Sequence, residues 1–357
     1  MTLVIAEAGV NHNGNEEMAF QLVDAAVSSG ADIVKFQTFK ANKLVTASAQ
    51  QADYQQTNTG IKESQLAMLS RLELSYDTHH QLVDYCQNKG VEFLSTAFDS
   101  ESLRFLTREL GITRLKIPSG DITNLPLVLE HAQLGKELIV STGMANLTEI
   151  ENALATIAFG MVCESGDKPS LAAFQEAYFS EEGKSALKQR VTILHCTTEY
   201  PAPMEDINLQ AMDTIAEAFR LTVGYSDHSE GITIPVAAVA RGAKVIEKHF
   251  TLSRTLPGPD HKASLEPDEL TEMVQSIRRV ERALGDGIKG PRPSEVKNKA
   301  VARKSLIAAK NIARGEIFDS ANIDIRRPGN GMSPATFWDL TGKTASRDYK
   351  AGDLILE

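Results

Sequence analysis

Short runs of β-favouring residues alternate with amphipathic segments over the first 285 residues of the chain. The β-type runs lie at 3–10, 33–39, 92–98, 114–120, 137–143, 191–198, 221–227 and 243–250. Between these runs, apolar side chains recur at every third or fourth position, which places them on one face of a helix. These segments predict helices at 16–29, 78–89, 101–109, 125–134, 147–160, 206–219, 231–241 and 267–283. Strands that alternate with helices pair in parallel through crossover connections, so eight such units predict a TIM (β/α)₈ barrel, an α/β fold.

Three stretches interrupt this alternation. Residues 40–73 are polar and long for a connection between a strand and a helix, so we expect a lid over a site. Residues 161–190 lengthen the connection that leads into the sixth strand. Gly, Pro and charged residues at 285–300 predict a linker between a catalytic barrel at 1–284 and a small β-rich domain at 301–357. A doubly wound sheet is the alternative for the first domain, but it rarely has eight evenly spaced units.

The composition is that of a globular protein, with 42% of the 357 residues hydrophobic and 24% charged. The formal net charge of −10 argues against a general nucleic-acid-binding protein, which needs a basic surface. A small anionic substrate in a locally basic pocket stays possible. No apolar run approaches the roughly 20 residues that span a bilayer, and no signal peptide is evident. The three cysteines are far apart without a CxxC pair, so we expect a cytoplasmic protein.

Polar side chains collect at the carboxyl ends of the predicted strands, where TIM-barrel enzymes hold their active sites. Lys35 and Lys116, with nearby hydroxyl groups, suit a compact dianion such as a phosphate. His228 and His249 come from neighbouring strands, and imidazoles with nearby carboxylates suit a divalent ion such as Mn²⁺ or Zn²⁺. Glu7, in an otherwise apolar strand, is a candidate general base or hydrogen-bonding anchor. Each has an ordinary structural explanation alone, but their common location predicts a phosphorylated small substrate and a metal-polarised carbonyl.

Nine motifs occur in an order that matches a known family. They are EAGVNHNG at 7–14, VKFQT at 34–38, KIPSG at 116–120, STGM at 141–144, HCTTEYP at 195–201, SDHS at 226–229, EKHFT at 247–251, GPDH at 258–261 and RRPGNG at 326–331. Through these motifs the whole chain resembles the bacterial sialic acid synthases, the phosphoenolpyruvate-dependent N-acetylneuraminate synthase family. The resemblance implies a TIM barrel followed by an antifreeze-like (SAF, β-clip) domain. It also implies a domain-swapped homodimer, in which the small domain of one subunit caps the barrel of the other.

The same resemblance implies a role for each matching residue. It implies that phosphoenolpyruvate is bound by Lys35, Gln37, Thr96, Lys116, Ser119 and Ser141. It implies that the sugar is bound by Tyr200, Asp227, Glu247, Asp260 and, across the subunit interface, Arg327. His228 and His249 resemble the ligands of a divalent metal ion, for which we expect Mn²⁺, and Glu7 resembles the acid/base residue. The chain departs from the family pattern at Asp121, where many members have Glu, and at Thr198, where some have Asn.

The reaction that the resemblance implies condenses phosphoenolpyruvate with N-acetylmannosamine to give N-acetylneuraminic acid and phosphate. The alternative acceptor is 2,4-diacetamido-2,4,6-trideoxymannose, which would give legionaminic acid, and a pseudaminic acid synthase is a weaker alternative. A 6-phosphorylated acceptor would need further basic residues near the far end of the sugar. A sugar- or ice-binding protein without catalytic activity is a rival of another class. Glu7, the two lysines and the two histidines argue against it.

Overall fold

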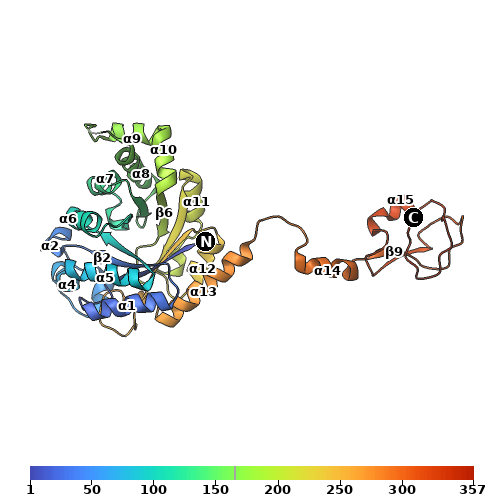
Figure 1. Ribbon diagram of the computed structural model, residues 1–357, viewed down its shortest axis with the longest axis horizontal. Helices are drawn as coiled ribbons and strands as arrows, with labels where there is room; N and C mark the ends of the chain where they lie inside the picture. The colour runs from blue at the N-terminus through green and yellow to red at the C-terminus, as the bar shows by residue number, and fades with distance from the viewer. Residues whose placement is uncertain (165) are drawn as a thin grey trace. The chain divides into compact units, whose positions relative to one another are not determined.

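The computed structural model describes residues 1–164 and 166–357 and divides into two compact units, Met1–Gly285 and Asp286–Glu357. The first unit is a closed barrel of eight strands in chain order (Figure 1). The strands are β1 (Leu3–Gly9), β2 (Ile33–Thr38), β3 (Glu92–Ala97), β4 (Arg114–Ile117), β5 (Glu137–Ser141), β6 (Val191–Cys196), β7 (Thr222–Asp227) and β8 (Val245–His249). All neighbours pair in parallel, and β8 pairs with β1 to close the ring. The predicted TIM barrel is confirmed.

Helices follow the strands and cover the outside of the barrel (Figure 1). They are α1 (Glu16–Ser28), α5 (Tyr76–Lys89), α6 (Ser100–Arg104), α7 (Leu125–Gln133), α8 (Leu147–Val162), α11 (Ala211–Phe219), α12 (Thr233–Ala240) and α13 (Pro267–Leu284). The π-helical stretch η1 (Phe105–Glu109) continues α6. The start of α1 is specified by its N-cap residue, Asn15, whose side chain accepts a hydrogen bond from the backbone N–H of Met18. The helix predicted at 206–219 begins later, at Ala211, because Asn208, with φ +48°, separates it from a short 3₁₀ turn.

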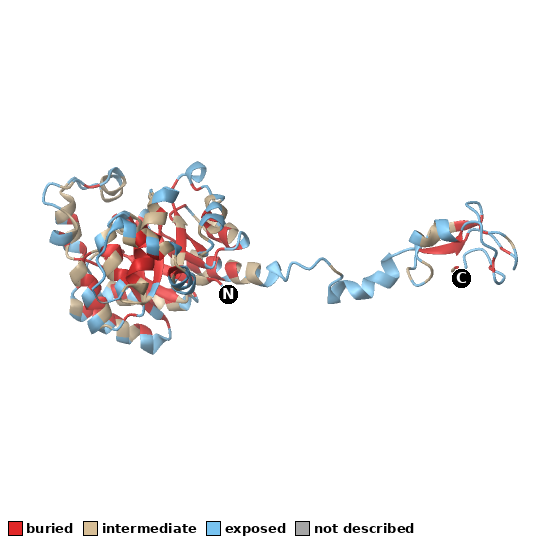
Figure 2. Cartoon of the chain, turned by 90° about the horizontal axis from the view of Figure 1, so that it is seen from above, coloured by how far each residue is buried: buried red, intermediate tan, exposed pale blue. Residues whose placement is uncertain are grey.

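The pleat of the strands divides the barrel interior into two levels. Side chains at alternate positions point inward, and near the amino ends of the strands they are apolar. This lower level is a closed cluster of Ile5, Ile33, Leu94, Ile139, Leu194 and Val245. Figure 2 shows that the buried residues are concentrated in the strands and on the inner faces of the helices. The apolar level fills the bottom of the barrel interior, so the space that remains inside the barrel lies toward the carboxyl ends of the strands.

The long connection after β2 lies over those carboxyl ends. It folds as α2 (Ala41–Leu44), α3 (Asp53–Thr59) and α4 (Gln65–Leu72). Met68 and Leu72 of α4 pack with Val10 and Phe39 in a small apolar cluster of their own. From α3, Asn58 donates a hydrogen bond of 2.7 Å to the backbone oxygen of Pro259, in the loop after β8. The connection therefore covers the barrel as the predicted lid would.

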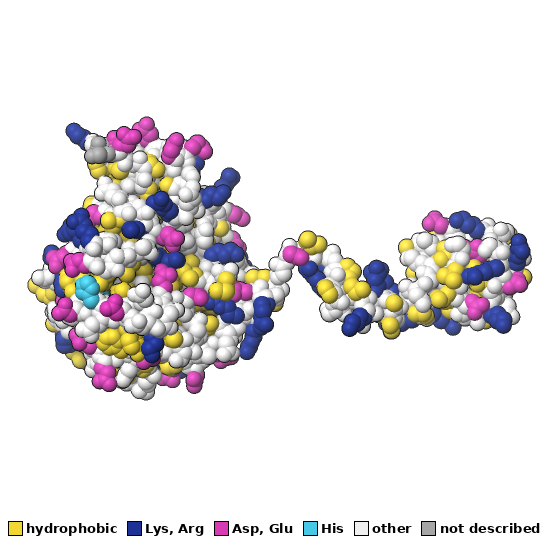
Figure 3. Space-filling model, viewed as in Figure 1, with side chains coloured by type: hydrophobic (Ala, Val, Ile, Leu, Met, Phe, Trp, Pro, Cys, Tyr) yellow, Lys and Arg dark blue, Asp and Glu magenta, His cyan; other side chains and the backbone are white. Residues whose placement is uncertain are grey.

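The stretch 161–190 forms α9 (Leu171–Phe179) and α10 (Glu181–Arg190). Both helices pack against α8 on the outside of the barrel. Acidic and basic side chains are interspersed on the face that Figure 3 shows, without the continuous basic area that a nucleic acid would need. No helix in the described part of the chain is both long and apolar enough to cross a membrane.

The second unit has a small apolar core of its own around Leu306, Ile312, Phe318 and Ile355. Its elements are α14 (Pro293–Ala302), the antiparallel pair β9 (Ser305–Ala308) and β10 (Ile323–Arg326), and α15 (Phe337–Leu340). The sequence of this unit has three short β-like runs: KSLIAA at 304–309 contains β9, whereas GEIF at 315–318 and DLILE at 353–357 contribute isolated bridges. The predicted linker 285–300 contains most of α14, which begins with Pro293 in its first turn.

Candidate active site

One cavity of about 230 Å³ lies at the carboxyl ends of the barrel strands. The structure describes all fourteen residues that were predicted for the site, and twelve of them line this cavity. The twelve are Glu7, Lys35, Gln37, Thr96, Lys116, Ser119, Ser141, Tyr200, His228, Glu247, His249 and Asp260. Eight of these stand on strands β1–β5 and β8, and the others stand on loops that follow strands β4, β6, β7 and β8. Residues from all along the chain therefore meet because the barrel closes.

Two lysines and two carboxylates form a buried charge network in the cavity. Lys35 Nζ lies 2.7 Å from Glu7 Oε2 and 3.6 Å from Glu247 Oε2. Lys116 Nζ lies 3.1 Å from Glu247 Oε1, which also accepts a 2.9 Å hydrogen bond from the Ser226 hydroxyl. Each of the four charged side chains is at most 6% exposed. Removal from water strengthens the interaction of these groups with one another and with any anion that binds.

The two carboxylates of the network differ in their affinity for protons. The pKa of Glu7 is raised to about 7: burial raises it, Lys35 offsets part of this increase, and the neighbouring Glu247 adds to it. Burial acts on Glu247 in the same direction, but contact with Lys116 and Lys35 holds the pKa of that carboxyl below its ordinary value. Glu7 can therefore hold or release a proton near neutral pH while Glu247 stays ionised. Such a separation of pKa values is the pattern of an acid/base site.

Hydroxyl groups surround the two ammonium groups. Lys35 Nζ donates a 3.2 Å hydrogen bond to Thr96 Oγ1. The Ser119 hydroxyl accepts a 2.9 Å hydrogen bond from the backbone N–H of Gly143, whose lack of a side chain permits this approach. The Ser141 hydroxyl is buried, and it has no hydrogen-bond partner within the part of the chain that the structure describes. Two cations with these donors provide the charge-assisted hydrogen bonds that a phosphate needs.

Two histidines face each other across the end of the barrel, with ring centroids 5.5 Å apart. His228 Nδ1 lies 2.6 Å from the backbone oxygen of Thr197, and this contact orients the ring. Burial and the neighbouring His228 and Lys35 keep the pKa of His249 well below its ordinary value, so its imidazole is neutral. Among the described residues, His249 Nδ1 is buried without a hydrogen-bond partner.

This pair fits a divalent metal ion. Neutral imidazole nitrogens are ligands that transition-metal ions prefer, and the Thr197 carbonyl supplies the outer hydrogen bond that commonly fixes a ligating histidine. Across residues 1–164 and 166–357, no three His, Cys, Asp or Glu side chains come together as a metal-binding group. A metal ion held here would have two protein nitrogens, and substrate or water would complete its coordination.

Aromatic rings cover the histidine pair. The Tyr200 ring lies 4.1 Å from the His228 ring, and Tyr54 of α3 stacks on Tyr200 at 5.1 Å. Asp260 lies on the same side of the cavity, and burial raises its pKa to about 6 although His228 acts in the opposite direction. The aromatic surface and this acid group form a polar and apolar wall of the kind that binds a sugar ring.

Sequence reasoning did not single out several residues that line the cavity. They are Val10, Tyr54, Gln55, Met68, Leu69, Leu72, Phe98, Pro118, Gly120, Cys196, Ser226 and Pro259. Cys196 and Ser226 could have been found from the strand periodicity. Each lies two residues after an inward-facing position of its strand, β6 or β7, and therefore faces inward as well. Tyr54 and Gln55 belong to the lid connection, where only the location of the segment could be predicted.

Two predicted residues are not among those that line this cavity. In β7, Val223 and Tyr225 face the outer helices, so Asp227 points outward by the same alternation. Its carboxylate lies 2.6 Å from Lys248 Nζ, and the structure does not place it at the sugar side of the cavity. Arg327 belongs to the second unit, where its Nε donates a 2.9 Å hydrogen bond to the backbone oxygen of Ala302. Its predicted contact with the sugar stays a prediction.

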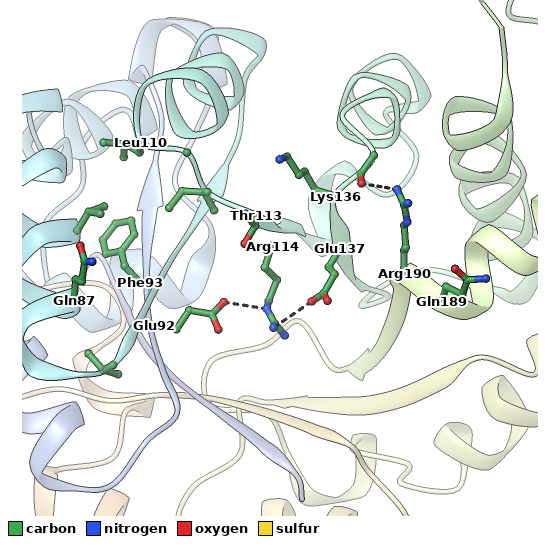
Figure 4. Close-up of a pocket in the computed structure, with 15 residues that line it drawn as sticks. Gln87, Glu92, Phe93, Leu110, Thr113, Arg114, Lys136, Glu137, Gln189 and Arg190 are labelled. Atoms are coloured by element: carbon green, nitrogen blue, oxygen red, sulfur yellow. Dashed lines mark hydrogen bonds and ion pairs between the residues drawn. The ribbon is translucent and has the colours of Figure 1, made fainter.

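A second, larger hollow of about 700 Å³ lies at the amino ends of β3, β4 and β5 (Figure 4). Arg114 pairs there with Glu92 at 3.0 Å and with Glu137 at 3.1 Å (Figure 4). The arginine is thereby neutralised, and the remaining walls combine apolar side chains such as Phe93 with polar ones such as Gln87 and Lys136. Because chemistry in TIM barrels takes place at the opposite end, these contacts contribute to stability. The smaller cavity is therefore the candidate active site.

The barrel and its buried acid/base network define the class of the protein as a TIM-barrel enzyme. Residues 22–289 match the NeuB family, and residues 303–357 match the SAF domain. The chain belongs to the NeuB family, and it is thus a synthase of the sialic acid type, which forms a carbon–carbon bond with phosphoenolpyruvate. The predicted SAF domain is confirmed.

Two relatives and one solved structure cover most of the chain. The chain is 49% identical to the N,N'-diacetyllegionaminic acid synthase of Campylobacter jejuni, over 100% of this chain and 99% of the relative. It is 43% identical to the N,N'-diacetyllegionaminic acid synthase of Legionella pneumophila, over 99% of this chain and 93% of the relative. The crystal structure of the N-acetylneuraminic acid synthetase from Leptospira borgpetersenii serovar Hardjo-bovis is 32% identical, with a TM-score of 0.66 over 83% of this chain and 90% of that one.

Proposed function

We propose that this enzyme condenses phosphoenolpyruvate with 2,4-diacetamido-2,4,6-trideoxymannose to give N,N'-diacetyllegionaminic acid and phosphate. The observation that carries the choice of acceptor is the full-length identity of 49% and 43% to two synthases of this acid. It favours the alternative acceptor over N-acetylmannosamine, on which the sequence analysis first settled. N-acetylmannosamine stays the second candidate, supported by the 32% identity to the Leptospira synthetase.

The choice of acceptor is tested by steady-state phosphate release with each sugar. We expect kcat/KM for the diacetamido sugar to exceed that for N-acetylmannosamine by at least about tenfold, since one or two additional hydrogen bonds account for that factor. A higher kcat/KM with N-acetylmannosamine would make the enzyme an N-acetylneuraminate synthase. Absence of phosphate release with both sugars would overturn the proposal.

The cavity supports a mechanism in which the phosphate of phosphoenolpyruvate is held by Lys35, Lys116 and Ser141. C3 of phosphoenolpyruvate attacks the aldehyde carbon of the open-chain sugar, and the positive charge that develops at C2 is quenched by water. Glu7, with a pKa of about 7, takes one proton from this water and returns a proton to the former aldehyde oxygen. The remaining proton leaves with the phosphate when the tetrahedral intermediate collapses. Fixed cationic groups stabilise the phosphate throughout.

His228 and His249 would hold the divalent ion, for which Mn²⁺ is our candidate. When bound, such an ion polarises a carbonyl oxygen as a Lewis acid. The tyrosine wall orients the sugar and excludes water from the aldehyde, and Asp260 lies where it can bond a sugar hydroxyl. Arg327 as a sugar contact from a neighbouring subunit and the domain-swapped homodimer are further proposals that rest on the family resemblance, and a cytoplasmic location is a proposal that rests on the three separated cysteines.

The phosphate assignment predicts a selective effect of Lys116→Ala. We expect KM for phosphoenolpyruvate to increase by roughly 10–150-fold, because a charge-assisted hydrogen bond contributes about 1.5–3 kcal/mol. KM for the sugar should change much less. Lys136→Ala is the matched control, since Lys136 lines the hollow at the amino ends of the strands. Equal increases of both KM values in Lys116→Ala would indicate a structural role for this lysine.

A further inference from the structure

Asp227 and Lys248 form an ion pair that is fully buried on the outer side of the barrel. Lys248 Nζ lies 2.6 Å from Asp227 Oδ2, and both side chains are 0% exposed. The two residues stand opposite each other in the register of β7 and β8, and α12 packs over these strands. Lysine and aspartate are almost never buried completely unless they are paired. The catalytic steps derived above do not use this pair.

The pair is connected to both histidines of the candidate metal site. Asp227 precedes His228 in the chain, and Lys248 precedes His249. The backbone N–H and the hydroxyl of Ser229 donate hydrogen bonds of 3.1 Å and 3.0 Å to the Asp227 carboxylate. Lys248 Nζ also donates to the backbone oxygen of Ser229. Asp227 and Ser229, which flank His228, are thus both bonded to Lys248, which precedes His249.

His228 lies outside the strand pairing of β7 and β8, and its backbone oxygen accepts a hydrogen bond of 2.9 Å from the N–H of Ala202. The register of β7 and β8 runs from Tyr225–Ile246 to Asp227–Lys248, so His228 follows the last paired residue. His249, in contrast, still pairs with Glu7 on β1. The distance between the two imidazoles therefore depends on contacts beyond the strand pairing, and the side-chain contacts of Asp227 and Ser229 are among them.

Stability alone does not account for this arrangement. An apolar pair of similar size is often as stable as a buried ion pair, because desolvation of the two charges offsets their attraction. The α12 sequence Thr233–Ala240 is largely apolar, so apolar side chains would suit the space beneath it. What an apolar pair could not reproduce is the set of directional hydrogen bonds to Ser229.

We propose that Asp227, Ser229 and Lys248 form a clamp that sets the separation and orientation of His228 and His249 for a divalent ion. The inference rests on the metal role proposed above for the two histidines. The three residues are positioning residues, since their side chains bond to each other and act on the ion through the histidines. Partners that orient metal ligands typically contribute 10–100-fold to metal affinity.

The test uses the full-length protein after removal of metal, with Mn²⁺ alone as the probe and without substrate. The double variant Asp227→Leu/Lys248→Met replaces the ion pair without leaving an unpaired buried charge. We expect its Kd for Mn²⁺, measured by isothermal titration calorimetry, to be 10–100-fold higher than that of the native protein. Its Tm should stay within a few degrees of the native value, and its affinity for phosphoenolpyruvate should stay unchanged.

The matched control is Asp32→Asn/Arg278→Met, which removes an ion pair of 2.7 Å between α13 and the start of β2. This pair lies at the amino end of the barrel, so the control should bind Mn²⁺ as the native protein does. Ser229→Ala removes one hydrogen bond of the clamp and no charge, and it should increase the Kd about threefold. Ser229→Ala decides the question if the double variant does not fold.

Two results would overturn the clamp, and they are distinguishable. If the native protein binds Mn²⁺ and a folded clamp variant binds it with the same Kd, the clamp is wrong and the proposed metal site stands. If the native protein and His249→Ala both fail to bind Mn²⁺, the metal site is wrong and the clamp fails with it.

Discussion

Replacement of His249 by alanine should reduce kcat/KM by more than about 100-fold. The cavity offers two imidazoles to a divalent ion, and among the described residues no third His, Cys, Asp or Glu completes a metal-binding group with them. Loss of a partner that merely orients a ligand costs about 10–100-fold, so loss of the ligand itself should cost more. Phosphoenolpyruvate should still bind to His249→Ala, because Lys35 and Lys116 are unchanged.

The measurement is the initial rate of phosphate release over a range of concentrations of each substrate, which gives kcat/KM, with and without added Mn²⁺. Excess chelator should stop the native enzyme, and Mn²⁺ should restore it. His195→Ala is the matched control, since His195 stands on β6 but its Nε2 lies 2.8 Å from the backbone oxygen of Ile207, away from the cavity. Native activity in excess chelator, or a kcat/KM of His249→Ala above about a hundredth of the native value, would contradict the metal assignment.

The barrel and most of its cavity could be predicted because both depend on local patterns. Periodicity of two residues in the strands and of three to four in the helices identified all eight units, and closure of the ring follows from their number. The same periodicity places Glu7 and Lys35 inside the barrel, since each follows an inward apolar residue, Ile5 or Ile33, by two positions. A chemical role for Glu7 and Lys35 could then be inferred from their burial together.

The prediction for Asp227 did not take into account which face of β7 its side chain occupies. The motif SDHS suggested that Asp227 joins its neighbour His228 at the site. Alternation in β7 sends Ser226 inward and Asp227 outward, and Lys248 stands opposite on the outer face of β8. The sequence contained this information, because side chains alternate between the two faces of a strand, which places Lys248 on the face opposite to Glu247 and His249.

Other parts of the structure depend on contacts between segments that are remote in the chain. Tyr54 reaches the site because α3 packs against the loop after β8, and no local pattern specifies that contact. In the second unit, β10 was not predicted, although Ile323 and Ile325 alternate with polar residues. Short strands of four residues carry little periodic signal, and they form here because β9 supplies a partner.

Replacement of Glu7 by glutamine should lower kcat by about 10²–10⁴-fold while KM for either substrate changes by less than about tenfold. Glutamine has nearly the same shape as glutamate, but it cannot accept and return a proton. Glu7 is the carboxyl whose pKa burial raises to about 7, so it is the group in the network that can exchange protons at neutral pH. Binding of phosphoenolpyruvate should persist, because Lys35 keeps its contacts with Glu247 and Thr96.

The experiment distinguishes the two roles that the sequence left open for Glu7, a general base and a hydrogen-bonding anchor. Steady-state kinetics of Glu7→Gln and Glu7→Asp are compared, with Tm as the check on folding. A proton carrier predicts a large loss of kcat in Glu7→Gln and a smaller one in Glu7→Asp, which keeps a carboxylate displaced by one methylene group. An anchor predicts the opposite order, because glutamine can still bond to Lys35 through its amide oxygen whereas the shorter aspartate cannot reach across the same 2.7 Å contact. A kcat of Glu7→Gln within tenfold of the native value would therefore exclude Glu7 as the proton carrier and leave it as an anchor for Lys35.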